Sequence, residues 1–366
     1  MITVLFAGGG TGGHLMPALA IAEAMVRLEP RVQPFFVGAE RGVESQVLPA
    51  RPWRHLLLPL EPIYRRRWWL NVRLPLSTWR SLRSLHTLLA AERPGLAVGT
   101  GGYASGLAIW AAARRGVPVV LQEQNALPGI ATRRLAPRAR QIHLGFPEAR
   151  QHLKPGPRTQ IFDSGNPIVP PPAPRPAPAA ARERLGFRPA LPVVVVVGGS
   201  QGALALNEAV AAALSGGDWP SDVQLLWQTG QAWSERFQSL AREGVRIEAF
   251  LDPMAQAYAA ADLVVCRAGA MTLAEVAAWG LPAILVPLPT AAANHQLTNA
   301  MALAAAGSAV VLEQHNLTGR SLGSDVAGLL GAPARMADLS RAISERAKSD
   351  AATRIARESL QLLDLA

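Results

Sequence analysis

The chain has 366 residues, 49% hydrophobic and 17% charged, a composition typical of a globular protein long enough for two domains. Its single cysteine, Cys266, excludes an internal disulfide and a cysteine-based zinc site, and no apolar run approaches the ~20 residues that a membrane span needs. The net charge of +10 lies in the first half, where residues 1–165 hold 21 Lys and Arg against 9 Asp and Glu. That half is expected to meet an anionic partner, namely nucleic acid, acidic lipid or a phosphorylated substrate.

The N-terminal segment ITVLFA (2–7) predicts a buried strand rather than a secretion signal, because no basic residues precede it. The glycine-rich loop GGGTGGH (8–14) follows, and a helix is expected from about Leu15 with Pro17 in its first turn. Such a loop at a helix N-terminus favours a phosphate or a sugar hydroxyl. His14 ends the loop and is either a base near neutral pH or a histidine bonded to nearby backbone. The acidic residue that a dinucleotide site requires is missing after the next strand.

The segment YRRRWWLNVRLPLSTWRSLR (64–83) combines six arginines with three tryptophans. Pro75 divides it, because proline is unfavourable inside a helix. After Pro75, apolar residues at helical spacing predict an amphipathic helix that buries Trp79, Leu82, Leu85 and Leu89. Before Pro75, tryptophans flanked by arginines are typical of contact with anionic lipid headgroups, and we assign this role to Arg65, Arg66, Arg67, Trp68 and Trp69.

Two further glycine or polar segments follow apolar runs in the first half. GGYASG (101–106) comes after LAVGT, and QEQN (122–125) ends the run VPVVLQEQN. At the carboxyl end of a parallel strand, Glu123 and Asn125 are expected to face the ligand, although turn formation is a sufficient role for the asparagine.

The proline-rich segment PIVPPPAPRPAPAAA (167–181) predicts a stiff linker without helix or central strand. It separates an N-terminal domain, 1–166, from a C-terminal domain, 182–366. Packing of the last helix against the N-terminal domain is compatible with this division. The second half repeats the pattern of the first, with short apolar strands that lead into glycine loops and alanine-rich helices. This alternation predicts two Rossmann-like α/β domains with parallel sheets that face a cleft.

The C-terminal half contains two glycine loops of interest. In GGSQGA (198–203), Ser200 is suited to a phosphate and Asn207 to bracing the loop. In RAGAMTLAE (267–275), Thr272 and Glu275 have the spacing of a capping box, in which the glutamate reaches back to its own helix start. The alternative is that the Glu275 carboxylate accepts hydrogen bonds from ribose hydroxyls. His295 and Gln296 lie in a third loop before a helix.

These segments together resemble one family. GGGTGGH, GGYASG, QEQN, GNP, GGSQGALALN, CRAGAMTLAEVAAWGLPAILVP and NHQLTNA occur in its order and approximate spacing over nearly the whole chain. The family comprises the bacterial transferases that add N-acetylglucosamine to undecaprenyl-pyrophosphoryl-N-acetylmuramoyl-pentapeptide, converting lipid I to lipid II. The resemblance implies the GT-B arrangement of two Rossmann-like domains and an inverting hexosyltransferase of peptidoglycan synthesis.

The resemblance also implies roles for particular residues. His14 would be the catalytic base. The donor UDP-N-acetylglucosamine would be bound by Thr11, Gly12, Gly13, Asn125, Ser200, Leu251, Ala270, Met271, Thr272, Leu273, Ala274, Glu275 and Gln296. Lipid I would be met by Gly101, Gly102, Tyr103 and Glu123.

The chain departs from the family at Val169, where members usually carry an arginine that helps to hold the donor. Valine cannot make a charge-assisted bond to phosphate, so either a nearby arginine such as Arg175 replaces it or donor affinity is lower.

The expected partners are UDP-N-acetylglucosamine, lipid I and an anionic membrane surface, at the cytoplasmic face of the bacterial plasma membrane. No cofactor is expected. No metal is expected either, because the sequence has no Asp-x-Asp motif. The alternatives are another UDP-sugar enzyme of this architecture, such as a glycolipid glycosyltransferase or a UDP-N-acetylglucosamine epimerase, a nicotinamide enzyme, and a nucleic-acid-binding protein. The last is disfavoured because no nucleic-acid-binding motif is present.

Overall fold

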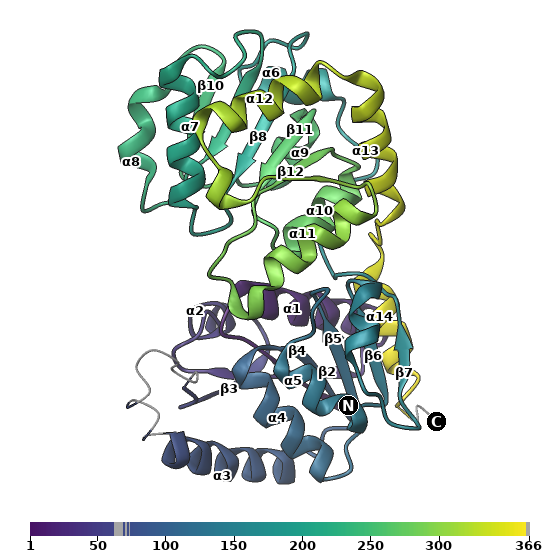
Figure 1. Ribbon diagram of the computed structural model, residues 1–366. Coiled ribbons are helices and arrows are strands. Elements are labelled where there is room, and N and C mark those ends of the chain that lie inside the picture. The colour runs from purple at the N-terminus through teal and green to yellow at the C-terminus, as the bar shows by residue number, and fades with distance from the viewer. Residues whose placement is uncertain (62–68, 70–71, 73, 364–366) are drawn as a thin grey trace. The chain divides into compact units, whose positions relative to one another are not determined.

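The computed structural model describes residues 1–61, 69, 72 and 74–363 (Figure 1). The chain forms two compact units. Unit 1 comprises residues 1–169 together with the C-terminal segment 348–366, and unit 2 comprises residues 170–347. The segment that ends the chain therefore belongs with the N-terminal unit, although the chain order alone places it after unit 2.

Unit 1 contains a seven-stranded sheet with the order β3-β2-β1-β4-β5-β6-β7, and every neighbouring pair is parallel. The continuous apolar runs predicted this arrangement, because strands buried on both faces need no polar alternation. The strands are β1 (Ile2–Gly8), β2 (Val32–Ala39), β3 (Arg54–Leu58), β4 (Leu96–Gly101), β5 (Val119–Glu123), β6 (Gln141–Leu144) and β7 (Gln160–Phe162).

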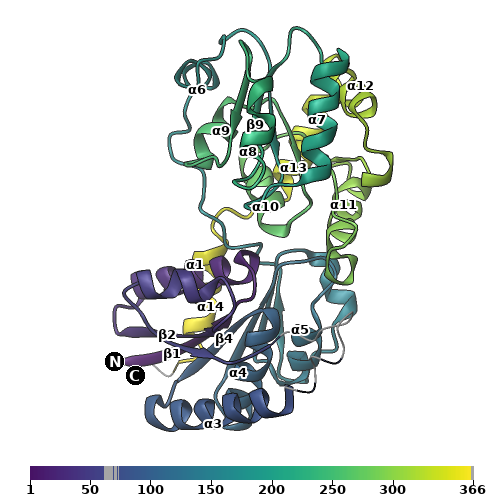
Figure 2. The same ribbon diagram turned by 90° about the vertical axis from the view of Figure 1, so that its left-hand side faces the viewer.

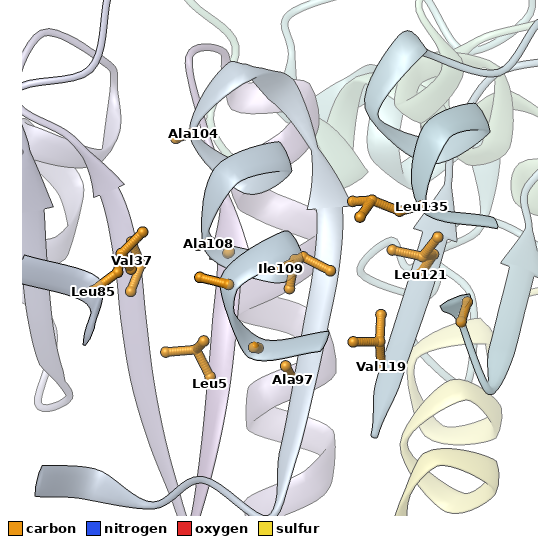
Figure 3. Close-up of a cluster of buried hydrophobic side chains, with 14 of the residues drawn as sticks. Leu5, Val37, Leu85, Ala97, Ala104, Ala108, Ile109, Val119, Leu121 and Leu135 are labelled. Carbon is orange, nitrogen blue, oxygen red and sulfur yellow. The ribbon is translucent and has the colours of Figure 1, made fainter. Parts of the chain in front are cut away.

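Helices cover both faces of this sheet. Along β1, Val4 and Phe6 pack with residues of α1 and α14 on one face, whereas Leu5 and Ala7 face the cluster formed with α3, α4 and α5 (Figures 2 and 3). This alternation follows from the two-residue period of a strand. The helices are α1 (Gly12–Leu28), α2 (Glu44–Val47), α3 (Leu74–Glu92), α4 (Gly102–Arg114), α5 (Ile130–Leu135) and α14 (Ala351–Leu360), with short 3₁₀ turns at Leu48–Ala50, Ala136–Arg138 and Pro147–His152.

Unit 2 contains a six-stranded parallel sheet with the order β10-β9-β8-β11-β12-β13. Its strands are β8 (Val193–Val197), β9 (Gln224–Gln228), β10 (Val245–Glu248), β11 (Leu263–Cys266), β12 (Ala283–Leu285) and β13 (Val310–Val311). Its helices are α6 (Pro178–Arg184), α7 (Leu204–Gly216), α8 (Ser234–Phe237), α9 (Met254–Ala260), α10 (Ala270–Trp279), α11 (His295–Ala305), α12 (Gly319–Leu330) and α13 (Pro333–Glu345), with 3₁₀ turns at Gln238–Leu240, Ala292–Asn294 and Gln314–Asn316. The predicted fold class, two Rossmann-like α/β domains, is confirmed.

The proline-rich segment is only partly the irregular linker that the sequence predicts. Helix α6 begins at Pro178, inside the predicted linker 167–181. Pro178 stands at the start of the helix, where its missing N–H has no intrahelical partner to lose. The prediction that the segment forms no helix was therefore wrong for its last residues.

The buried side of α3 also differs from the prediction. Leu85 and Leu89 are buried as expected, and Pro75 lies in the first turn of the helix. Trp79 is 57% exposed, however, so the prediction that it lies in the core was wrong. Arg83 lies over the Trp79 ring, with its guanidinium carbon 5.9 Å from the ring centroid. The helix thus begins with exposed apolar and basic side chains and buries Leu85 and Leu89 further along.

Candidate active site

In unit 1, the glycine-rich loop after β1 leads directly into α1 and places His14 in the first turn of that helix. Thr11 precedes the helix in an extended conformation, and its hydroxyl lies 3.0 Å from His14 Nδ1. His14 and Leu15 both donate backbone N–H groups to the Thr11 carbonyl. The N–H groups of Gly12 and Gly13 precede this ladder, as at any helix N-terminus, where phosphate or hydroxyl oxygens are good acceptors.

The start of α1 corrects one detail of the prediction. The helix begins at Gly12 rather than near Leu15, so Pro17 lies beyond its first turn. Because proline has no N–H, the carbonyl one turn earlier, at Gly13, receives no helical hydrogen bond from it. Pro17 is buried.

The loop between β4 and α4 packs against this first loop. Gly101 and Gly102 have φ angles of 95° and 84°, which favour glycine. A Cβ atom on Gly102 would lie 2.0 Å from the carbonyl oxygen of Gly9, and a Cβ on Gly101 would lie 2.9 Å from His14 Cδ2. The Gly101 backbone therefore lies directly against the His14 ring.

We expect Gly102→Ala, which would clash with Gly9, to lower the free energy of unfolding far more than Gly116→Ala does. Both glycines have positive φ, but no atom lies within 4 Å of a Cβ on Gly116. The backbone strain alone should lower the free energy of unfolding by about 1–2 kcal/mol in Gly116→Ala, whereas the added clash in Gly102→Ala should exceed about 3 kcal/mol. Chemical denaturation of both variants is the measurement, and equal losses would show that the contact between the loops contributes nothing.

Glu44 is a residue of this site that the sequence reasoning missed. Its side chain is fully buried at the start of α2, and its carboxylate accepts hydrogen bonds from the N–H groups of Gly10 (2.9 and 3.1 Å) and Ala39 (2.8 Å). A Cβ atom on Gly10 would lie 2.8 Å from Tyr103 Cε1, so the tyrosine ring lies against Gly10. A Cβ would collide with the Glu44 side chain at three further positions, Gly9, Gly38 and Gly42. These glycines around one acidic residue are the only sequence signal that could have found it.

Glu123, which we predicted to face the ligand, is instead enclosed by its own turn. It is 3% exposed, and its two carboxylate oxygens accept from the N–H groups of Asn125 (3.1 Å) and Gly129 (3.0 Å). The Asn125 amide lies 3.3 Å from the same carboxylate. Glu123 therefore shapes the turn that carries Asn125, and it is placed to orient the asparagine rather than to bind a ligand itself.

A buried network of side-chain amides connects the strand ends beside these glycine loops. Gln124 donates to the Thr100 carbonyl at 2.6 Å and to the Gln122 side chain. Gln122 donates to the Asn166 side chain at 3.0 Å, and Asn166 donates to the Gln124 carbonyl at 3.0 Å. The GNP segment and the QEQN segment thus meet beneath the two glycine loops, which explains why polar residues end these otherwise apolar strands.

In unit 2, the GGSQGA loop lies against the end of β9. A Cβ on Gly202 would lie 2.0 Å from the Thr229 carbonyl oxygen, and the Gln228 amide donates to the Gly199 carbonyl at 3.1 Å. Ser200 is exposed at the tip of this loop. Asn207, which we expected to brace the loop, donates to the same Thr229 carbonyl at 2.8 Å and accepts from Trp227.

Helix α10 starts at Ala270, and its first turn contains Met271, Thr272 and Leu273. The capping-box interpretation of Glu275 was wrong, because Gly269 is the N-cap and makes no side-chain bond. Glu275 instead accepts a hydrogen bond from the Tyr258 hydroxyl at 3.0 Å. Burial raises the pKa of Glu275, and the Tyr258 bond opposes that rise. A carboxylate held partly out of water in this way is prepared to accept hydrogen bonds from a ligand.

The other predicted donor residues of unit 2 lie on two further loops. Leu251 is buried at 9% exposure and follows the exposed Phe250. Gln296 lies in the first turn of α11, where its side-chain oxygen accepts from the Leu288 N–H at 3.0 Å. Its amide NH₂ group therefore provides the donors that this side chain has for a ligand.

Arg175 does not replace the missing family arginine. Its guanidinium donates to the carbonyls of Ala278 (2.7 Å) and Trp279 (3.2 Å), at the C-terminal end of α10. That helix spans Ala270–Trp279, so its two ends lie about 15 Å apart at 1.5 Å per residue. Arg175 thus binds the end of α10 that carries partial negative charge, away from the end that suits a phosphate.

Most of the predicted lipid-contacting segment lies outside the described residues, namely Arg65, Arg66, Arg67 and Trp68. Trp69 is described and is 57% exposed. Further exposed apolar side chains near it in the chain are Val72, Leu76 and Trp79. No helix in the described part of the chain is long and apolar enough to span a membrane.

Two family models match the chain. Residues 4–144 match the N-terminal domain of glycosyltransferase family 28, and residues 193–355 match its C-terminal domain. The chain belongs to glycosyltransferase family 28. This membership sets aside the nicotinamide and nucleic-acid interpretations as primary functions.

Similar proteins cover almost the whole chain. A protein of Salinibacter ruber, named UDP-N-acetylglucosamine–N-acetylmuramyl-(pentapeptide) pyrophosphoryl-undecaprenol N-acetylglucosamine transferase, is 39% identical over 99% of this chain and 97% of its own. A Moorella thermoacetica protein of the same name is 41% identical over 87% of this chain and 88% of its own. The crystal structure of MurG from Acinetobacter baumannii superposes with a TM-score of 0.78 at 25% identity, over 98% of this chain and 99% of that one.

Proposed function

We propose that this family 28 enzyme transfers N-acetylglucosamine from UDP-N-acetylglucosamine to the 4-hydroxyl of the muramic acid in lipid I, which yields lipid II. The observation that carries the proposal is the 39% identity over nearly the full length to a relative named for this reaction. Two glycine loops at helix N-termini, one in each unit, supply the N–H groups that a sugar diphosphate and its acceptor require.

We assign His14 as the base that takes the proton of the acceptor hydroxyl. The acceptor oxygen forms a bond to the anomeric carbon, while the bond from that carbon to the diphosphate oxygen breaks and its electron pair leaves with UDP. For Nε2 to take the proton, Nδ1 must carry its own hydrogen, and the Thr11 hydroxyl at 3.0 Å is the acceptor that favours this tautomer. The N–H groups at the start of α10, beginning at Ala270, stabilise the charge on the leaving diphosphate.

The remaining residues divide between the two substrates. The donor is assigned to Thr11, Gly12, Gly13, Asn125, Ser200, Leu251, Glu275 and Gln296 together with the α10 residues from Ala270 to Ala274. The acceptor is assigned to Gly101, Gly102 and Tyr103, with Glu123 acting through the turn that it shapes.

Incubation with UDP-N-acetylglucosamine and a short-chain lipid I analogue tests the reaction. The expected product is heavier than the acceptor by one N-acetylhexosamine residue, and UDP is released in equal amount. An unchanged acceptor together with a 2-epimerised sugar would replace the proposal with an epimerase, and transfer to a different glycolipid would replace only the acceptor.

Glu275 provides a test of the donor site through pH. If its ionised form accepts from the ribose hydroxyls, donor affinity should fall as pH drops through its raised pKa. Glu275→Gln should abolish this dependence and weaken UDP binding by about 10- to 100-fold at pH 7, because bonds to a charged group are lost.

The same variant should raise the thermal unfolding midpoint of the unliganded protein. A carboxyl whose pKa is raised by folding favours the folded state while protonated, and that contribution is lost as pH rises through the folded pKa. Glutamine cannot ionise, so it retains the contribution at pH 7. Calorimetry on Glu275→Gln and on the exposed control Glu243→Gln measures both effects, and a lower midpoint with unchanged UDP affinity would remove Glu275 from the site.

We further propose that unit 1 carries the enzyme as a peripheral protein to the cytoplasmic face of the plasma membrane. Exposed Trp69 and Trp79 support this, because indole rings favour the headgroup boundary and the first half of the chain is strongly basic. A lipid I acceptor is reached only at such a surface.

Replacement of Trp69 and Trp79 by serine should weaken binding to vesicles containing anionic lipid by about 10-fold or more. Activity on the short-chain acceptor should stay near wild type, because that substrate needs no bilayer. Met301→Ser in unit 2 is the matched control, since Met301 is 51% exposed. Sedimentation with vesicles at low and high salt is the measurement, and unchanged binding would move the membrane contact elsewhere.

A further inference from the structure

Arg267 is a buried cation that links three neighbouring strand ends in unit 2. It directly follows β11, and 7% of its surface is exposed. Its guanidinium donates to the carbonyls of Val286 (3.1 Å) and Pro287 (3.4 Å), just after β12, and to the Gln314 side chain (2.8 Å), in the 3₁₀ turn after β13. One side chain therefore fixes the carboxyl edge of the sheet across β11, β12 and β13.

Burying the Arg267 guanidinium in this way carries a high desolvation cost. All three partners of the guanidinium are neutral oxygens, and no ion pair found among the described residues includes Arg267. Burial lowers the pKa of Arg267, but a guanidinium remains protonated in proteins. For a buried cation without a carboxylate partner, hydrogen bonds alone offset the cost of desolvation. A side chain of this kind at the edge where ligands bind an α/β sheet points to a role in the site.

The segment that Arg267 holds is also the one that orients Gln296. Arg267 binds the carbonyls of Val286 and Pro287, and the next N–H, at Leu288, donates to Gln296 Oε1 at 3.0 Å. The Gln296 amide therefore cannot turn without breaking its bond to Leu288. On the same helix, Asn299 donates to the Ala268 carbonyl at 3.2 Å, which ties α11 to the turn between Arg267 and α10.

We propose that Arg267 is a positioning residue for the sugar of the donor. By fixing residues 286–288 it aims the Gln296 amide, and so it sets how the sugar lies relative to the diphosphate at the start of α10. The inference rests on the proposed donor site. It predicts a selective effect, in which contacts to the sugar depend on Arg267 while contacts to the nucleotide do not.

Arg267→Lys keeps the charge but loses the planar fork that reaches two carbonyls and an amide. We expect it to weaken UDP-N-acetylglucosamine binding by about 10-fold while UDP binding changes by less than about 3-fold, measured by calorimetric titration. Gln314→Ala removes one partner of the guanidinium and should move the same ratio by about 3-fold, so the test survives if Arg267→Lys folds poorly.

A matched control lies at the opposite end of the same strand. Arg182 is also largely buried, and it holds Asp262, just before β11, with two bonds of 2.8 Å. Arg182→Lys should lower the thermal midpoint without changing the ratio of the two affinities. An equal change of that ratio in both variants would show that Arg267 acts through general stability.

Coupling to Gln296 gives the decisive measurement. If Arg267 acts through Gln296, the double variant Arg267→Lys/Gln296→Ala should bind UDP-N-acetylglucosamine no more weakly than Gln296→Ala alone. Additive losses would overturn the proposal. Failure of the wild-type enzyme to bind UDP-N-acetylglucosamine more tightly than other UDP-sugars would instead count against the proposed function and is visible before any variant is made.

Discussion

Replacement of His14 by alanine is expected to lower kcat by about 10²- to 10⁴-fold, the range that a positioned general base contributes. The affinity for UDP-N-acetylglucosamine should stay near wild type, because the proposed donor contacts lie mainly in residues 200–296. Single-turnover kinetics with the short-chain acceptor separates the chemical step from binding.

Thr11 supplies the control for this interpretation. Its hydroxyl lies 3.0 Å from His14 Nδ1. Thr11→Val should lower kcat by about 10-fold, because the imidazole loses the acceptor that favours the Nδ1-protonated tautomer. Thr11→Ser keeps a hydroxyl and should have near wild-type activity. Near-normal turnover in His14→Ala would assign the proton to another group. Equal activity of the valine and serine variants would show that the hydroxyl does not orient the imidazole.

Replacement of Glu44 by glutamine should lower the free energy of unfolding of unit 1 by about 2–3 kcal/mol, even though the two side chains have the same shape. The carboxylate accepts from the N–H of Gly10 with both oxygens, and an NH₂ group in place of one oxygen would face that donor. The Ala39 N–H also donates to one of these oxygens, so that position must stay an acceptor. Rotation of the glutamine amide therefore cannot remove the conflict between its NH₂ group and the Gly10 N–H. Chemical denaturation measures the loss.

The same substitution should also reduce kcat, because Gly10 leads directly to Thr11 and His14. Glu40→Gln is the matched control, since Glu40 is exposed just after β2 and should change neither stability nor turnover. A loss of stability without a loss of kcat would make Glu44 a folding residue only. A loss of neither would mean that the loop holds its shape without the carboxylate.

Several errors of the sequence interpretation have one cause. Helical spacing placed Trp79 in the core, a capping box was one of two roles considered for Glu275, and Arg175 was one of two ways to account for Val169. Each side chain has a different partner in the structure: Arg83 for Trp79, Tyr258 for Glu275 and the end of α10 for Arg175. The contacts of Glu275 and Arg175 join different elements, which local periodicity does not encode. For Trp79, helical spacing says which residues share a face but not whether that face meets the core.

The sequence by itself determined the two Rossmann-like units and the position of each glycine loop. Continuous apolar runs require sheets covered on both faces, and a run that ends in glycines must turn sharply into a helix. The order of the motifs also identified the family. These features are local, so they can be read without knowing which segments meet.

Only the tertiary structure decided which side chains hold those loops in place. Glu44 reaches Gly10 from 34 residues away in the chain, and Arg267 reaches Gln314 from 47 residues away. Neither belongs to a spacing pattern, because each satisfies backbone or amide groups brought close by the parallel strand order. A buried charge is retained only where the folded chain supplies enough hydrogen-bond partners, and that number depends on the three-dimensional arrangement rather than on the neighbours in sequence.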